Sequence, residues 1–123
     1  MTKIGLVLDP AFGPRILALA RSCHVWVVAS PDNSPVIREV WQELGPAVTS
    51  FKRAPGEPLQ HQCAAVADLI EAHHGEHAQD PPWSEIEVFG VALDDELRDV
   101  FADLGATAFE ATRDGFVARR EGP

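Results

Sequence analysis

Apolar runs separated by polar turns divide the sequence into alternating strand and helix patterns. Continuous apolar runs predict buried strands at 4–9 and 24–30, and a shorter, more polar run predicts a third at 47–51. A run at 85–91 alternates polar and apolar positions at its start, which is typical of a partly exposed strand. Unbroken apolar strands occur mainly in sheets that are covered on both faces. The pattern therefore indicates an α/β protein.

Helical periodicity follows each of these strands, at 15–20, 35–44, 58–74 and 94–104. Ser34 is suited to cap the second of these helices, with Pro35 at its first position. Asp94 is suited to cap the fourth, and Gly105 to end it. The longest helix, 58–74, carries an apolar stripe of Leu59, Cys63, Val66, Ala67 and Ile70.

The C-terminal part predicts a β-hairpin, because two strand-like runs, 106–112 and 116–120, are joined by Arg113-Asp-Gly115. The complete order is βαβαβαβα followed by the hairpin. It predicts one three-layer α/β domain over 1–123, with a mainly parallel sheet of about five strands and helices on both faces. The hairpin is expected to add an antiparallel edge strand. Rossmann-like and flavodoxin-like strand orders are both open.

Polar side chains gather in the loops that follow the predicted strands. In a parallel sheet these loops meet at the carboxyl edge, where ligands of open α/β sheets bind. A polar or phosphorylated small molecule would suit them, although acids and amides there are also common capping and turn residues. No glycine-rich phosphate loop is present, since the first loop holds one glycine between two prolines. The candidate ligand residues are Asp9, Phe12, Gly13, Ser30, Asp32, Asn33, Ser34 and Arg53.

No arrangement of residues predicts catalysis or a metal centre. His73 and His77 are four apart, but Gly75 interrupts the helix between them, so we expect no metal ion. Cys63 falls on a buried stripe and is expected to act as a small apolar residue. No Ser/His/Asp or Cys/His set can be assembled, so the catalytic residues are unknown and an enzyme is the less favoured reading. No cofactor is predicted.

Charge is distributed unevenly along the chain. The net charge is −9, and residues 68–110 hold twelve acidic side chains against one arginine. Such a surface would repel nucleic acid and attract a basic protein, or simply keep the chain soluble. Trp83 follows two prolines in a predicted loop over 76–84, where it could be an exposed anchor or could pack over the end of the long helix. The candidate partner-binding residues are Trp83, Asp94, Asp95 and Glu96.

The remaining features predict a soluble cytoplasmic protein. No run approaches the ~18 apolar residues of a membrane span, and no signal peptide is apparent. Cys23 and Cys63 fit no disulfide framework. The leading interpretation is a small acidic, non-catalytic interaction module, for which a homodimer formed through a helix face or through the hairpin edge is a possible assembly. The alternative is a binding protein or enzyme for a nucleotide-like or phosphorylated small molecule at the carboxyl edge of the sheet.

Overall fold

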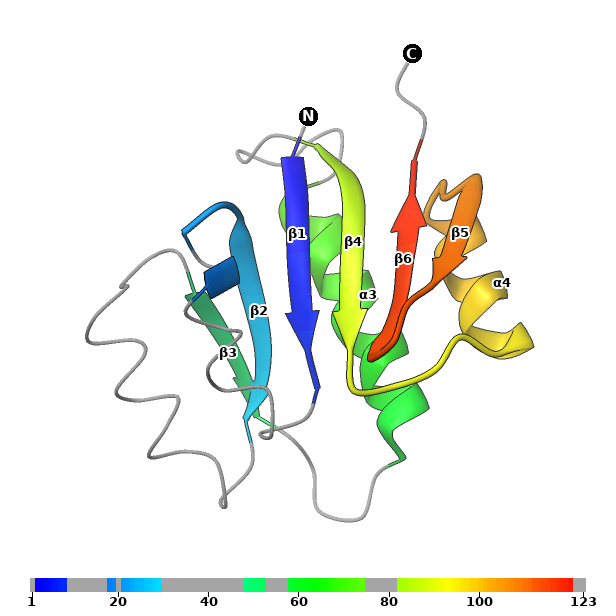
Figure 1. Cartoon of the computed structure of the whole chain (residues 1–123), viewed down its shortest axis with the longest axis horizontal. Helices are drawn as coiled ribbons and strands as arrows, with labels where there is room; N and C mark the ends of the chain where they lie inside the picture. Colours follow the sequence, from blue (N-terminus) through cyan, green and yellow to red (C-terminus); the bar gives the residue numbers. More distant parts are fainter. Residues whose placement is uncertain are drawn as a thin grey trace.

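The structure, a computed structural model, describes residues 2–8, 18–19, 21–29, 48–52, 58–74 and 82–120. In these residues six strands form one sheet in the order β3-β2-β1-β4-β6-β5 (Figure 1). The strands are β1 (Thr2–Val7), β2 (His24–Ala29), β3 (Val48–Lys52), β4 (Trp83–Phe89), β5 (Ala108–Ala111) and β6 (Gly115–Arg119). The helices with described bounds are α3 (Leu59–His74) and α4 (Asp95–Asp103). Neither of them is long and apolar enough to cross a membrane.

The sheet is mixed, and the prediction of a mainly parallel sheet is corrected in this respect. β1, β2, β3 and β4 run parallel, whereas β6 is antiparallel to both β4 and β5. The hairpin adds an antiparallel edge strand, as predicted: its second strand, β6, lies against β4, and its first strand, β5, is at the edge. The order of the first four strands, 3-2-1-4, is that of Rossmann-type sheets and differs from the flavodoxin-like order.

Helices α3 and α4 contact each other and lie behind the sheet in Figure 1. The apolar stripe predicted for α3 packs there: Cys63, Val66, Ala67 and Ile70 are fully buried in the same cluster as Ile4. The predicted helices at 15–20 and 35–44 lie outside the described residues, apart from 18–19. Helices on both faces therefore remain a prediction.

Alternation along β4 explains why this strand separates two environments. Ile86 and Val88 are fully buried in the core, whereas Glu85 and Glu87, which alternate with them, are partly exposed on the other face. The strand begins at Trp83, two residues earlier than predicted, because this side chain is also fully buried. Its indole ring fills one end of the core, although the proline and polar residues before it predicted a loop.

Local chemistry fixes the ends of α4 as predicted. The Asp94 carboxylate accepts a hydrogen bond from the backbone N–H of Leu97 at 2.8 Å, which satisfies a donor of the first turn. Gly105 follows the helix with a φ of 100°, a backbone conformation that favours glycine. Leu97 and Phe101 then face inward, and the Phe101 ring packs edge-on against Phe116 of β6 with 5.4 Å between ring centroids.

Candidate functional site

The strand order creates a switch point between β1 and β4. From β1 the chain passes to β2 and β3 on one side, and it returns through α3 to β4 on the other side. The two central strands end together, because Val7 pairs with Phe89 and the N–H of Leu8 donates to the Phe89 carbonyl at 2.9 Å. The next strands along the chain lie on opposite sides: β2, which follows β1, is on one side, and the β5–β6 pair, which follows β4, is on the other. In open α/β sheets ligands bind at this position, outside the carboxyl ends of the strands.

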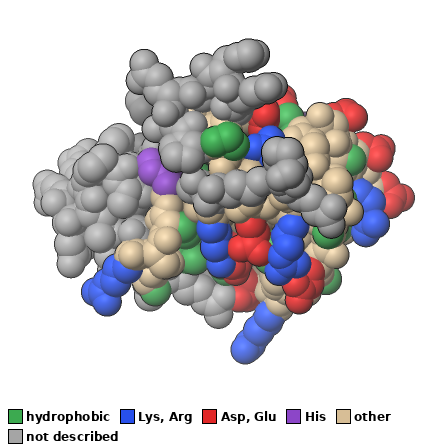
Figure 2. Space-filling view, turned by 90° about the horizontal axis from the view of Figure 1, so that it is seen from above, with side chains coloured by type: hydrophobic (Ala, Val, Ile, Leu, Met, Phe, Trp, Pro, Cys, Tyr) green, Lys and Arg blue, Asp and Glu red, His purple; other side chains and the backbone are tan. Residues whose placement is uncertain are grey.

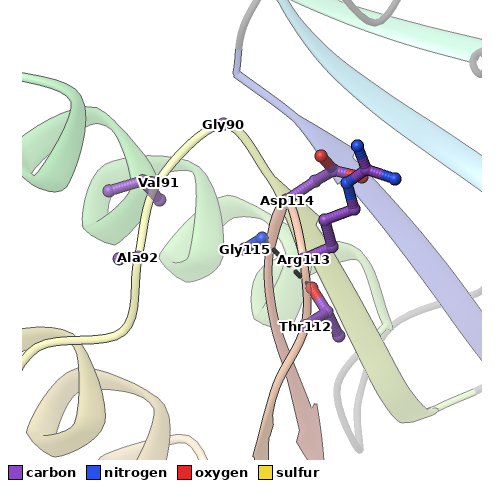
Figure 3. A pocket seen from close by; sticks show the side chains of 7 residues that line it. All are labelled: Gly90, Val91, Ala92, Thr112, Arg113, Asp114 and Gly115. Carbon is purple, nitrogen blue, oxygen red and sulfur yellow. Dashed lines mark hydrogen bonds between the residues drawn. The ribbon is translucent and has the colours of Figure 1, made fainter.

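A hollow of about 370 Å³ adjoins the carboxyl end of β4 (Figure 3). One wall is the start of the loop that leads from β4 to α4, and the other wall is the tip of the β5–β6 hairpin. The tip lies at this edge because β6 runs antiparallel to β4, so that the first residue of β6 pairs with Phe89. The lining residues are Gly90, Val91, Ala92, Thr112, Arg113, Asp114 and Gly115.

Close contacts fix the hairpin tip against the end of β4. The N–H of Gly90 donates to the Asp114 carbonyl at 2.9 Å, and the N–H of Gly115 donates to the Thr112 hydroxyl at 3.1 Å. Gly115 approaches β4 so closely that a Cβ atom added to it would lie 2.0 Å from the Val88 carbonyl oxygen. Gly90 has a φ of 106°, which favours glycine at the turn out of β4. The hollow is thus bounded by backbone that the sheet holds in place.

Two charged side chains project from this tip. In Figure 3 Arg113 and Asp114 extend away from Val91 and Ala92. Arg113 is exposed and Asp114 is half-buried. The guanidinium group can bind a carboxylate or phosphate with two parallel hydrogen bonds. The tip can therefore offer an anion-binding group.

The predicted ligand residues cannot be compared with this geometry, because all eight lie outside the described residues. They are Asp9, Phe12, Gly13, Ser30, Asp32, Asn33, Ser34 and Arg53. The described ends of β1, β2 and β3 do lie at the carboxyl edge, as the prediction required. A shared site therefore remains a prediction.

The predicted partner-binding residues have different roles in the structure. Trp83 was considered as an exposed anchor, and this is wrong: the side chain is fully buried, and its indole N–H donates to a Glu71 carboxylate oxygen at 2.5 Å. Packing against the end of α3, the alternative interpretation, explains its position. Asp94 caps α4, while Asp95 and Glu96 in the first turn are exposed. A basic partner and a homodimer both remain predictions.

Arg120 joins three elements at the opposite, amino edge of the sheet. Its guanidinium carbon lies 4.2 Å from the centroid of the Trp83 ring, and its Nε donates to the Trp83 carbonyl at 3.0 Å. Its Nη1 donates to Glu71 at 3.1 Å and to the Leu104 carbonyl at 3.4 Å. Aromatic, carboxylate and backbone groups together surround one cation, so this cluster has a structural role.

On the face of the sheet that does not pack against α3, acidic side chains form ion pairs with Lys and Arg side chains. Lys3 contacts Glu87 at 3.1 Å, and Arg119 contacts Glu85 at 2.8 Å and Glu110 at 2.9 Å. Figure 2, which looks onto the amino edge, shows Lys and Arg side chains interspersed with Asp and Glu side chains over the described part of the surface. The acidity of residues 68–110 is therefore partly neutralised in this region by residues from outside that segment.

Neither cysteine is an activated nucleophile. Burial raises the pKa of the Cys63 thiol to about 12, and burial is also the main cause of the raised pKa of Cys23. A raised pKa keeps a thiol protonated, whereas the thiolate is the reactive form.

Histidine rings lie close together at the amino edge, where the ring centroids of His24 and His74 are 5.9 Å apart. Among the described residues no group of three or more His, Cys, Asp and Glu side chains could hold a metal ion.

Comparison with solved structures shows a fold similarity. The chain is similar to an O-methyltransferase family protein from Burkholderia thailandensis, with a TM-score of 0.52 and 10% sequence identity. The match covers 97% of this chain and 51% of that chain. The similarity is one of fold alone. The chain spans about half the length of the structure it matches. A scan against protein-family models and a search of curated proteins found no match.

Sequence reasoning identified the carboxyl edge but missed the residues that line the hollow. Gly90 and the segment 112–115 were assigned to a strand end and a turn, with no role in binding. Their sequence signal was the Asp114-Gly115 pair, which predicted a hairpin correctly. It could not show that β6 lies next to β4, and this neighbour places the hairpin tip against the end of β4.

Proposed function

We propose that this protein binds a nucleotide-like or phosphorylated small molecule at the carboxyl edge of the sheet, between the loops that follow β1 and β4. The strand order carries the proposal, since β1 and β4 are neighbours from which the chain leads in opposite directions. The open hollow of about 370 Å³ adjoins this place on the other side of the end of β4, between the β4–α4 loop and the hairpin tip, and offers room for one end of such a ligand.

The chemistry of the neighbouring loops supports the same ligand class. Asp9 and the segment 30–34 follow β1 and β2 in the sequence, and Arg53 follows β3. Carboxylates and hydroxyl groups suit the sugar of a nucleotide, and arginine suits its phosphate. The prolines around Gly13 remove backbone donors, so we expect side chains, more than a glycine-rich loop, to bind the anionic group.

The similarity to an O-methyltransferase family protein agrees with a small-molecule site but specifies no reaction. Sites differ between proteins of one fold, and this chain corresponds to about half of that structure. A non-catalytic interaction module is the second interpretation of the sequence. The burial of Trp83 removes one of the observations that favoured it.

A ligand screen tests the proposal. We would measure thermal shifts of the purified chain with nucleoside monophosphates, nucleosides and sugar phosphates, and then dissociation constants by calorimetry. A bound ligand raises the melting temperature by an amount that grows with the logarithm of its concentration relative to its dissociation constant. We expect at least one panel member to bind, and Asp9→Asn to weaken that binding.

Asp103→Asn is the matched control for this variant. It removes the same charge from an exposed position at the end of α4 nearest the amino edge. We expect it to bind the ligand as the unaltered chain does. Absence of binding by every nucleotide, nucleoside and sugar phosphate would refute the proposed function. Equal weakening by both variants would show a general effect of charge and would refute the role of Asp9.

A further inference from the structure

We infer that Arg113, at the tip of the β5–β6 hairpin, selects ligands that carry a phosphate or carboxylate group at the carboxyl edge. This inference rests on the proposed function and names the group that distinguishes one ligand from another. Arg113 is a specificity determinant that touches the ligand's anionic group, and it takes no part in a reaction. It was not among the ligand residues predicted from the sequence.

The position of the hairpin tip is the first argument. The tip is fixed to the end of β4 by the hydrogen bond from Gly90 to Asp114 and by the close approach of Gly115 to Val88. Arg113 therefore projects from backbone whose place at the carboxyl edge is determined by the sheet. In Figure 3 its side chain extends from the tip, away from Val91 and Ala92. A ligand bound at the carboxyl edge beside β4 would have its end near this guanidinium group.

The state of the guanidinium group is the second argument. Three arginines lie in the C-terminal hairpin region, and two of them have carboxylate partners: Arg119 contacts Glu85 and Glu110, and Arg120 contacts Glu71. Arg113 takes part in none of the ion pairs found among the described residues, and it is exposed. It is thus the arginine of this region whose donors face solvent at the edge of a hollow.

The chemistry of arginine sets the ligand class. A guanidinium group is always charged and matches the geometry of phosphate and carboxylate oxygens with two parallel donors. The neighbouring Asp114 carboxylate partly offsets this charge. We therefore expect an anionic ligand to gain the binding free energy of one charged hydrogen-bonded pair. Neutral ligands of the same shape make no such pair. Arg113 should therefore affect selectivity between anionic and neutral ligands more than overall binding.

Calorimetry with matched ligand pairs tests this selectivity. The probes are adenosine monophosphate against adenosine, and ribose phosphate against ribose. We expect Arg113→Gln to weaken binding of the phosphorylated member of a pair about tenfold, as for the loss of a charged hydrogen bond. Binding of the neutral member should be unchanged. The melting temperature of the free variant should equal that of the unaltered chain, because the side chain is exposed.

Arg21→Gln is the matched control, since Arg21 is an exposed arginine that precedes β2 at the amino edge. It should leave the affinity for both members of each pair unchanged. Phosphorylated ligands that bind Arg113→Gln as tightly as the unaltered chain would overturn the inference and leave the proposed function standing. Equal losses for phosphorylated and neutral ligands would also overturn it. An unaltered chain that binds no probe would refute the proposed function itself, and the inference with it.

Discussion

Replacing Arg120 with alanine tests whether one side chain joins β4, α3 and the end of α4 at the amino edge of the sheet. The change removes donors to the Trp83 carbonyl, to Glu71 and to the Leu104 carbonyl, together with the cation over the Trp83 ring. It also leaves the Glu71 carboxylate without its cation. Because the partners lie on different elements, their loss should weaken the whole fold.

The expected magnitude follows from the contacts and their exposure. Hydrogen bonds to charged groups contribute about 1.5–3 kcal/mol each, and a cation over an aromatic ring contributes about 0.5–2 kcal/mol. The side chains of Arg120 and Glu71 are 19% and 31% exposed, so solvent screens part of their attraction. We therefore expect the free energy of unfolding to fall by about 3 kcal/mol, less than the sum of the separate contributions. In urea this corresponds to a midpoint shift of roughly 1–2 M.

Urea unfolding followed by tryptophan fluorescence measures the effect, and Arg119→Ala is the matched control. Arg119 is the adjacent arginine of the chain, but its side chain is 44% exposed, against 19% for Arg120, and its partner Glu110 is 60% exposed. Exposed ion pairs contribute little, so its midpoint should stay close to that of the unaltered chain. Equal midpoints for the two variants would refute the reasoning. A double-mutant cycle with Glu71→Gln should show coupling of more than about 0.5 kcal/mol with Arg120→Ala.

Other positions give predictions that unfolding experiments can check. Gly115→Ala should lower the free energy of unfolding by about 2–4 kcal/mol, because its Cβ would lie 2.0 Å from a backbone oxygen of β4. Gly5→Ala, whose Cβ would meet nothing nearer than 3.5 Å, should change it by less than about 1 kcal/mol, and equal losses would contradict this account. Stability should decrease as the pH rises from 9.0 toward 12, because folded Cys63 keeps a proton that the unfolded chain releases; Cys63→Ala should decrease less steeply. Asp94→Ala should lower the free energy of unfolding by about 1 kcal/mol through loss of the helix cap. Asp95→Ala removes the same charge and leaves the cap in place, so it should lower the free energy of unfolding less. Equal losses would contradict the capping role of Asp94.

Local patterns predicted most of the described elements because neighbouring residues determine them. The predicted apolar stripe that includes Cys63 and Ile70 is the buried face of α3. Asp94 caps α4 by a hydrogen bond to Leu97, only three residues further along the chain. Trp83 is the instructive exception. Prolines and polar residues before it predicted a loop, yet the energy of burying an indole ring that also finds a carboxylate for its N–H outweighs that local preference.

The hairpin shows a correct prediction with a different physical cause. An Asp-Gly pair favours turns in which both residues have positive φ, but among the described residues only Gly90 and Gly105 have positive φ. The turn residues are Arg113 and Asp114, and Gly115 is the first residue of β6. Glycine is needed there because β4 leaves no room for a Cβ. A contact between strands, which no local pattern encodes, thus determines this residue.

The same reasoning explains how far the candidate site could be predicted. Loops that follow parallel strands meet at one edge, so the sequence could assign Asp9 and Arg53 to the carboxyl edge without knowing the strand order. The switch point requires more, namely that β4 returns to lie beside β1 and that β6 is inserted next to β4. That insertion places the hairpin tip with Arg113 directly against the end of β4, whereas a β5 strand placed against β4 would change the neighbours of the tip. Strand order is determined by packing across the whole sheet, and the part of the site that depends on it becomes visible only in the folded chain.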